Sequence, residues 1–173
     1  MSTTTIEDQL AEVRGRIDRL QARVQAGAPR TRRHLDALDE EEAAVRAAVR
    51  EAPDEVEEKL GRLRTRLDVA EHSLEADASD DWTTFATAVE AELQSWDTYL
   101  ERLQTSVAAK AWRAREQAEA AIGDVRSRRI AVGERLAQVR DSDGAVSQEA
   151  RTRITAARDE LERTAAELSR KLN

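Results

Sequence analysis

An apolar stripe of about sixty residues is the feature that most constrains the fold. Between Trp82 and Val139, apolar side chains recur every three or four residues, apart from one skipped turn at Arg128 and Arg129. Such spacings place side chains on one face of a helix. At a rise of about 1.5 Å per residue the helix would be about 90 Å long, which predicts an elongated helical bundle or coiled coil. The stripe comprises Trp82, Phe85, Val89, Leu93, Trp96, Leu100, Leu103, Val107, Ala111, Ala114, Ala118, Ile122, Val125, Val132, Leu136 and Val139.

Composition supports an all-α class. Charged residues make up 36% of the 173 residues and aromatic residues only 3%, with Ala, Leu, Val, Arg and Glu dominating the rest. This mixture, with a helical period, is typical of long helices and coiled coils. We therefore predict one all-helical domain over 1–173, with helices over about 4–26, 30–77, 80–140 and 146–172.

Local signals set these expected boundaries. Thr4 followed by Glu7 is a capping-box pattern that begins the first helix, and Gly27-Ala28-Pro29 ends it. Ser79 or Asp80 is the expected N-cap of the helix over 80–140. Asp141-Ser142-Asp143-Gly144 ends that helix.

Pro53 falls inside the second helical run. The apolar stripe keeps its phase across it, at Val45, Val49, Ala52 and Val56. We favour one helix kinked at Pro53 over two separate helices, although Ala-Pro-Asp-Glu at 52–55 would also make a good helix start. Separately, three glycines inside the predicted helices are candidates for close helix approach or mild bends: Gly61, Gly123 and Gly133.

Short loops between long helices favour antiparallel neighbours. The predicted lengths then pair 30–77 with 80–140 in a long hairpin whose tip lies near 78–81. Shorter N- and C-terminal helices would pack at its base. The remaining arm, residues 53–106, would be two-stranded.

Acidic and aromatic residues gather on this arm. Residues 53–79 hold eight acids and four bases, and residues 80–106 hold six acids and one base, a net charge of −9. A two-helix arm leaves apolar surface open, and Trp and Tyr are common interface anchors. The arm is therefore predicted to self-associate or to bind a protein partner; alternatively its aromatics fill the hairpin seam. The candidate partner residues are Trp82, Phe85, Trp96 and Tyr99.

Patterns for catalysis and metal binding are weak. His72 shares a helix face with Asp68 and Glu75, which is half of a carboxylate–histidine metal site, but the other histidine, His34, follows three arginines. We expect both histidines to lie on the solvated surface. We predict no catalytic residues, no metal, no cofactor and no enzyme activity.

Net charge disfavours nucleic acid as a partner. The chain carries −7 overall, although residues 107–140 hold eight bases against four acids. We expect those bases to pair with acids of the last helix, such as Glu149, Asp159, Glu160 and Glu162.

The N-terminus carries no signal-peptide pattern, and no window has eighteen consecutive apolar residues. We expect a cytoplasmic protein, and the high ratio of Arg to Lys suggests a bacterial source. The predicted function is a non-catalytic coiled-coil scaffold or adaptor, forming a homodimer and binding an unidentified protein through the arm. The alternative is a peripheral protein that lays amphipathic helices on a membrane surface.

Overall fold

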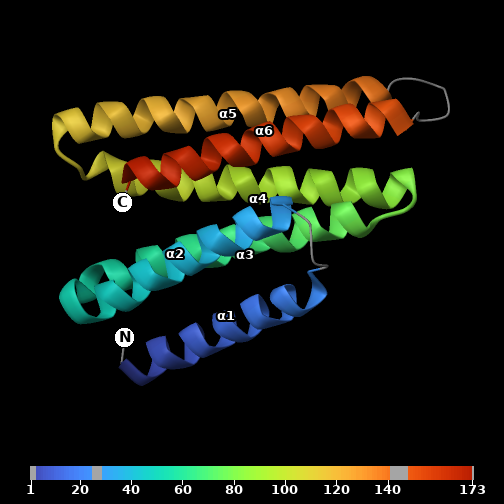
Figure 1. The fold of residues 1–173 in the computed structure, drawn as a ribbon. Helices are drawn as coiled ribbons and strands as arrows, with labels where there is room; N and C mark the ends of the chain where they lie inside the picture. Colours follow the sequence, from blue (N-terminus) through green and yellow to red (C-terminus); the bar gives the residue numbers. More distant parts are fainter. Residues whose placement is uncertain (1–2, 25–28, 141–147, 173) are drawn as a thin grey trace.

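The computed structural model describes residues 3–24, 29–140 and 148–172; apart from short turns these ranges are helical, with no strand (Figure 1). The chain order is α1 (Thr3–Arg23), α2 (Pro29–Glu51), a short 3-10 helix η1 (Pro53–Glu55), α3 (Val56–Ala78), α4 (Trp82–Ala108), α5 (Trp112–Arg140) and α6 (Gln148–Leu172). The all-α prediction is confirmed.

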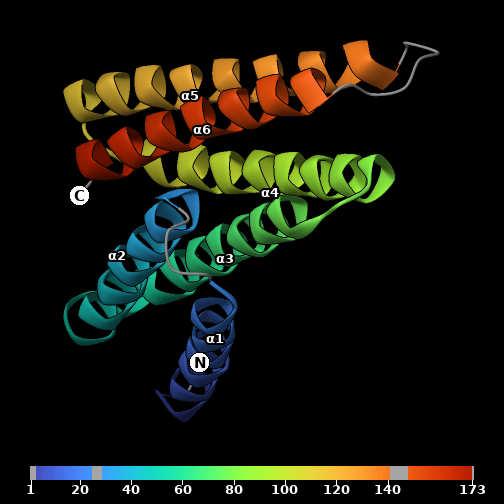
Figure 2. The same cartoon turned by 45° about the vertical axis from the view of Figure 1, so that its right-hand side comes forward.

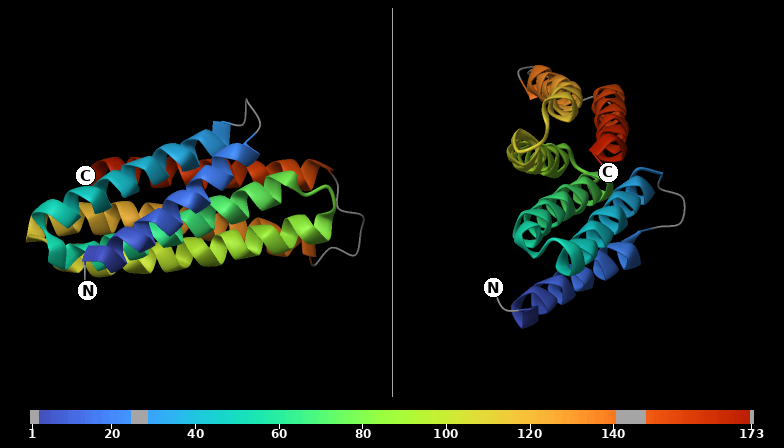
Figure 3. Two further views of the ribbon diagram at one scale, coloured as in Figure 1. Left: turned by 90° about the horizontal axis from the view of Figure 1, so that it is seen from below. Right: turned by 90° about the vertical axis from the view of Figure 1, so that its left-hand side faces the viewer.

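The α-helices are similar in length and lie side by side. They have 21 to 29 residues, which corresponds to about 32–44 Å each. Each helix from α2 to α5 packs on the next, and α2 also contacts α6, so α2–α6 form a closed ring. Figure 3 shows this ring end-on, with α1 outside it against α2 and α3. The predicted 90 Å helix is therefore wrong, and of the long hairpin built on it only the pairing of α3 with α4 around the turn at 79–81 is present.

The first unpredicted reversal occurs at Pro53. Helix α2 ends at Glu51, Ala52 leaves helical geometry at φ −145° and ψ 71°, and Pro53 opens η1. Proline has no backbone N–H and disfavours the helical conformation in the residue before it. Helix α3 then packs back along α2 (Figure 2). A single kinked helix over 30–77 is wrong, and the alternative of two helices is correct.

The second reversal lies between Ala108 and Trp112. The Lys110 N–H donates to the Val107 carbonyl at 3.0 Å, and Ala109 takes φ −83° and ψ −6°. Ala109 is right-handed, and the turn contains neither Gly nor Pro to mark it in the sequence. The apolar stripe continues in phase across the turn, which is why the prediction of one helix over 80–140 is wrong.

Two helix starts also differ from expectation. Asp81, not Ser79 or Asp80, caps α4, with its Oδ1 accepting from the Thr84 N–H at 2.9 Å. Pro29 does not end a helix but begins α2, where its missing N–H costs nothing. The stops predicted at 27–28 and 141–144 lie outside the described residues.

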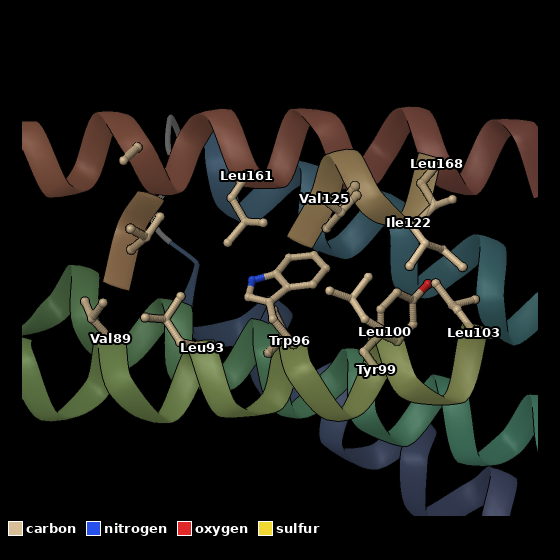
Figure 4. Packing of buried hydrophobic residues seen from close by; sticks show 14 of the residues in the cluster. Val89, Leu93, Trp96, Tyr99, Leu100, Leu103, Ile122, Val125, Leu161 and Leu168 are labelled. Atoms are coloured by element: carbon tan, nitrogen blue, oxygen red, sulfur yellow. The ribbon is translucent and has the colours of Figure 1, made fainter. Parts of the chain in front are cut away.

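Two apolar clusters form the interior, and α3 contributes to both. One side of α3 packs Leu60, Leu63 and Leu67 against α1 and α2. Its other side joins α4, α5 and α6. Between these last three helices lies an apolar region next to the Trp96 and Tyr99 rings (Figure 4), and its aliphatic side chains are here called the apolar seam: Leu100, Leu103, Ile122, Val125, Leu161 and Leu168.

Candidate functional site

The structure places most of the predicted partner residues inside the ring. Phe85, Trp96 and Tyr99 are 0–2% exposed, and Trp82 is partly buried against Phe85, with ring centroids 5.7 Å apart. Figure 4 shows Trp96 and Tyr99 rising from α4 into the space below α5 and α6. A partner would reach these rings only if the helices separated.

Polar groups from other helices hold the two central rings. The Arg66 guanidinium lies 4.5 Å from the centroid of the Trp96 ring, a cation–π distance. The Tyr99 hydroxyl donates to Glu41 Oε1 at 2.7 Å. Burial and the neighbouring Glu41 carboxylate raise the pKa of Tyr99. These contacts fix the rings as parts of the helix packing.

Arginines of other helices neutralise acids of residues 53–106. From α1, Arg16 bonds Asp68 and Glu71, each at 2.7 Å. From α5, Arg129 forms a two-bond pair with Asp97 at 2.7 and 2.8 Å. Arg140, also on α5, pairs with Glu90 of α4 through a single bond. Much of the charge asymmetry of the sequence is therefore matched within the chain.

A cluster of buried charges lies where α2, α3, α4 and α6 meet. Arg158 of α6 donates to Glu92 Oε2 at 2.8 Å, to Asp77 Oδ1 at 2.9 Å and to the Ser73 hydroxyl at 3.0 Å. Arg30 of α2 bonds the same Asp77. We call this cluster the polar junction: the buried Arg30, His34, Arg66, Ser73, Glu92, Arg158 and Glu162, with the more exposed Asp77 at its edge. Charges that are paired and hydrogen-bonded in this way are the form in which charge is tolerated in an interior.

Hydrogen bonding sets the protonation of His34 within the junction. Its Nδ1 lies 3.0 Å from Arg66 Nη1, which can only donate, so a neutral ring carries its proton on Nε2. That Nε2 faces Glu162 Oε2 at 3.4 Å. Burial, reinforced by Arg66 and Arg158, lowers the pKa of His34 well below its ordinary value. His34 is therefore neutral near pH 7, and the prediction that it lies on the surface is wrong.

Glu162 is the group of the junction that responds to pH near neutrality. Burial raises its pKa to about 7, against the opposing effect of Arg66 and Arg33. Arg33 Nε donates to Glu162 Oε1 at 2.8 Å. The charge of the junction therefore changes around neutral pH.

The second histidine shows little of the metal site that its spacing suggested. His72 Nδ1 lies 3.7 Å from Glu75 Oε2, while Asp68 is bonded to Arg16. Among the described residues, no group of His, Cys, Asp and Glu side chains is arranged to hold a metal ion.

Three basic residues of α5 bond to side chains of α4 and not to the predicted acids of α6. Arg129 and Arg140 pair with α4, as above, and Arg126 donates to Gln104 of α4. The acids expected to receive them are used elsewhere: Asp159 by Arg30 and Arg33, and Glu149 by Arg153. The prediction that α5 pairs with the acids of α6 is therefore wrong for these arginines.

Two large apolar side chains of the described residues are exposed, and both lie on α5. Trp112 is 69% exposed and Ile130 is 53% exposed. The Arg115 guanidinium lies 5.7 Å from the Trp112 ring centroid. Ile130 lines a groove between α4 and α5 together with Asp97, Glu101, Arg126 and Arg129. The prediction from the sequence used only the inner apolar stripe of this helix. It therefore did not include Trp112 or Ile130 as exposed candidates, because neither residue belongs to that stripe.

No helix of the described chain combines the length and apolarity needed to cross a bilayer. Comparisons of the chain with protein-family models, with curated proteins and with solved structures find no match.

Proposed function

We propose that this protein is a non-catalytic helical scaffold or adaptor that self-associates and binds protein. The observation that carries the proposal is the exposure of Trp112 and Ile130 on one helix. Trp is among the commonest anchors of protein-binding surfaces, and Ile130 lies among charged side chains in a groove between α4 and α5. The recognition surface in this proposal is α5, since the aromatic residues of 53–106 are mostly buried.

Size-exclusion chromatography with in-line light scattering tests self-association. We expect a mass near twice the 19.3 kDa of one chain, rising with protein concentration. The variant Trp112→Ala should shift the population to monomer without loss of helicity, because this side chain contributes little to the interior. A wild-type protein that stays monomeric at every concentration would contradict the proposal.

A membrane-surface role is the second candidate, and one observation favours it. The exposed Trp112 is flanked in sequence by Lys110, Arg113 and Arg115, and an aromatic ring among bases suits the surface of an anionic bilayer. Co-sedimentation with phosphatidylserine-containing vesicles, with pure phosphatidylcholine vesicles as the control, tests this role. Binding to the anionic vesicles that is lost in Trp112→Ala would favour it over the scaffold.

A further inference from the structure

The outward side of α5 carries a second regular pattern, separate from its buried stripe. Exposed or half-buried residues recur with spacings of 4, 3, 4, 3 and 4, which is the spacing of a coiled-coil seam between two helices. We call these residues the α5 face: Trp112, Glu116, Glu119, Gly123, Arg126 and Ile130. The described helices cover none of its apolar members, so this seam has no partner helix within the chain.

We infer that the α5 face pairs antiparallel with the α5 face of a second copy of this chain. This inference rests on the proposed self-association and specifies its surface. In an antiparallel pair centred on Ala121, Trp112 meets Ile130 of the second copy, and the symmetry repeats this contact at the other end. Such a self-complementary contact is what a two-fold dimer requires.

Charge complementarity favours this partner and register. The same pairing sets Glu116 opposite Arg126 of the second copy, twice. Glu116 forms no ion pair with any described residue, and Arg126 is held only by the amide of Gln104 among the hydrogen bonds found. A parallel pair would instead place each charge opposite its own kind, which is repulsive.

Gly123 supplies an independent reason for a close neighbour. A Cβ at Gly61 would lie 2.5 Å from Arg102 Nη1, and one at Gly133 would lie 3.2 Å from Arg129 Nη1. At Gly123 a Cβ would meet nothing within 4 Å, so the chain's own packing does not require this helix-weakening residue. In the antiparallel pair Gly123 faces the longer Glu119 of the second copy, and its missing side chain makes room there.

A membrane fits the whole face less well than a second helix. Trp112 and Ile130 lie eighteen residues apart, which is five turns and about 27 Å along the helix. A bilayer that received both would also have to receive Glu116 and Glu119 between them. A second α5 offers Arg126 to Glu116, while Glu119 keeps its pair with Arg115 of its own helix.

Charge reversal with rescue is the direct test, read by sedimentation equilibrium of the full chain. We expect Glu116→Arg and Arg126→Glu each to weaken dimerisation by about tenfold, and the variant with both changes to recover most of it. Arg128→Glu is the matched control, since Arg128 is exposed on α5 but lies off the face. It should leave the dissociation constant unchanged. Circular dichroism verifies that each variant is folded.

The outcomes separate this inference from the proposed function. A dimer that ignores both reversals, or that is not rescued by the double variant, would overturn the α5 pairing and leave self-association standing. A wild-type chain that is monomeric up to about 200 µM, where a dimer with a micromolar dissociation constant would be largely formed, would overturn both. Monomers that bind anionic vesicles through Trp112 would do the same and assign the face to lipid.

Pulsed electron paramagnetic resonance gives the orientation. The chain has no cysteine, so Gln138→Cys allows one spin label per copy. An antiparallel pair centred on Ala121 puts the two labels about 50 Å apart along the axis. A parallel pair would hold them within about 20 Å, and that result would refute the proposed geometry.

Discussion

The polar junction and the apolar seam lie next to each other in one ring, and α6 contributes to both. In the junction, Arg158 and Glu162 meet charges from three other helices. In the seam, Leu161 and Leu168 of the same helix lie among apolar side chains of α4 and α5, with the Trp96 ring beside Leu161 (Figure 4). Apolar contact is non-directional, whereas the bonds of a guanidinium accept few geometries. The difference indicates that the seam supplies buried area, while the junction selects which helices meet and in what register.

Removing Arg158 should produce the largest loss of stability. Arg158→Ala leaves the buried Glu92 carboxylate without its guanidinium, and breaking a buried pair costs about 3–5 kcal/mol. Urea unfolding followed by circular dichroism measures the change. The control is Arg163→Ala on the same helix, whose exposed pair with Glu160 spans 3.9 Å and should cost less than about 0.5 kcal/mol. Similar losses in the two variants would contradict a special role for the junction.

Truncation in the seam should cost slightly less. Leu161→Ala removes a fully buried side chain and leaves a cavity, for an expected loss of about 2–4 kcal/mol. Leu161→Met keeps the volume and should cost less than about 1.5 kcal/mol. Salt distinguishes the seam from the junction more sharply. Added NaCl should leave the loss in free energy of unfolding caused by Leu161→Ala unchanged, because this substitution removes no charge. A strong salt dependence would mean that the seam is not purely apolar.

Only the junction should make stability depend on pH near neutrality. The pKa of Glu162 is raised to about 7 in the folded chain, so its contribution is complete below its unfolded pKa and is lost as pH rises toward 7. One such group changes the free energy of unfolding by at most about 1.4 kcal/mol per pH unit. The difference between wild type and Glu162→Gln should follow this course, whereas the difference for Leu161→Ala should be flat.

His34 should act in the opposite direction. Because its pKa is lowered in the folded chain, His34 binds a proton in the unfolded chain at pH values where it stays neutral in the folded chain. Its contribution is therefore present above about pH 6.5 and is lost as pH falls below that value. Unfolding of His34→Gln between pH 5 and 8 isolates this effect. A wild-type curve that is parallel to the variant's would show that His34 does not titrate differently in the two states.

The smallest effect is expected at the edge of the junction. Tyr99→Phe keeps the ring beside Trp96 but removes the hydroxyl bonded to Glu41 at 2.7 Å. A hydrogen bond to a carboxylate can contribute about 1.5–3 kcal/mol, but Arg62 lies 3.6 Å from the other Glu41 oxygen and still compensates the charge, so we expect a loss of only about 1 kcal/mol. Thermal unfolding measures it. A loss of stability as large as that of Arg158→Ala would show that the Tyr99–Glu41 bond is as important for stability as the bonds of the polar junction.

Helical content could be predicted from the sequence, but the two tightest reversals could not. At Ala52 and at Ala109 the apolar stripe continues in phase, so periodicity alone cannot distinguish a long helix from two helices that fold back. Pro53 indicated a break in the helix, but the unbroken phase of the apolar stripe favoured the prediction of one kinked helix. The turn at 109–111 offered none, since its residues are Ala, Lys and Ala.

The polar junction had a sequence signal that the leading stripe concealed. On α3, Arg62, Arg66, Val69, Ser73 and Ala76 form a second stripe with spacings of 4, 3, 4 and 3, and all are buried. Two stripes on one helix indicate two packed faces, and therefore a central position in the fold. Charges within such a stripe are ambiguous in sequence, because only the tertiary structure shows whether opposite charges meet them.

The contact between α2 and α6 has a consequence for the order of assembly. The other contacts of the ring join helices that are consecutive in the chain, but Arg30 and Asp159 are 129 residues apart. Helix α6 leaves the ribosome after the other helices, so Glu92 and Asp77 remain without Arg158 until it arrives. Folding during synthesis thus passes through an open, charged groove between α2 and α4 in which Glu92 lacks its guanidinium until α6 closes the ring.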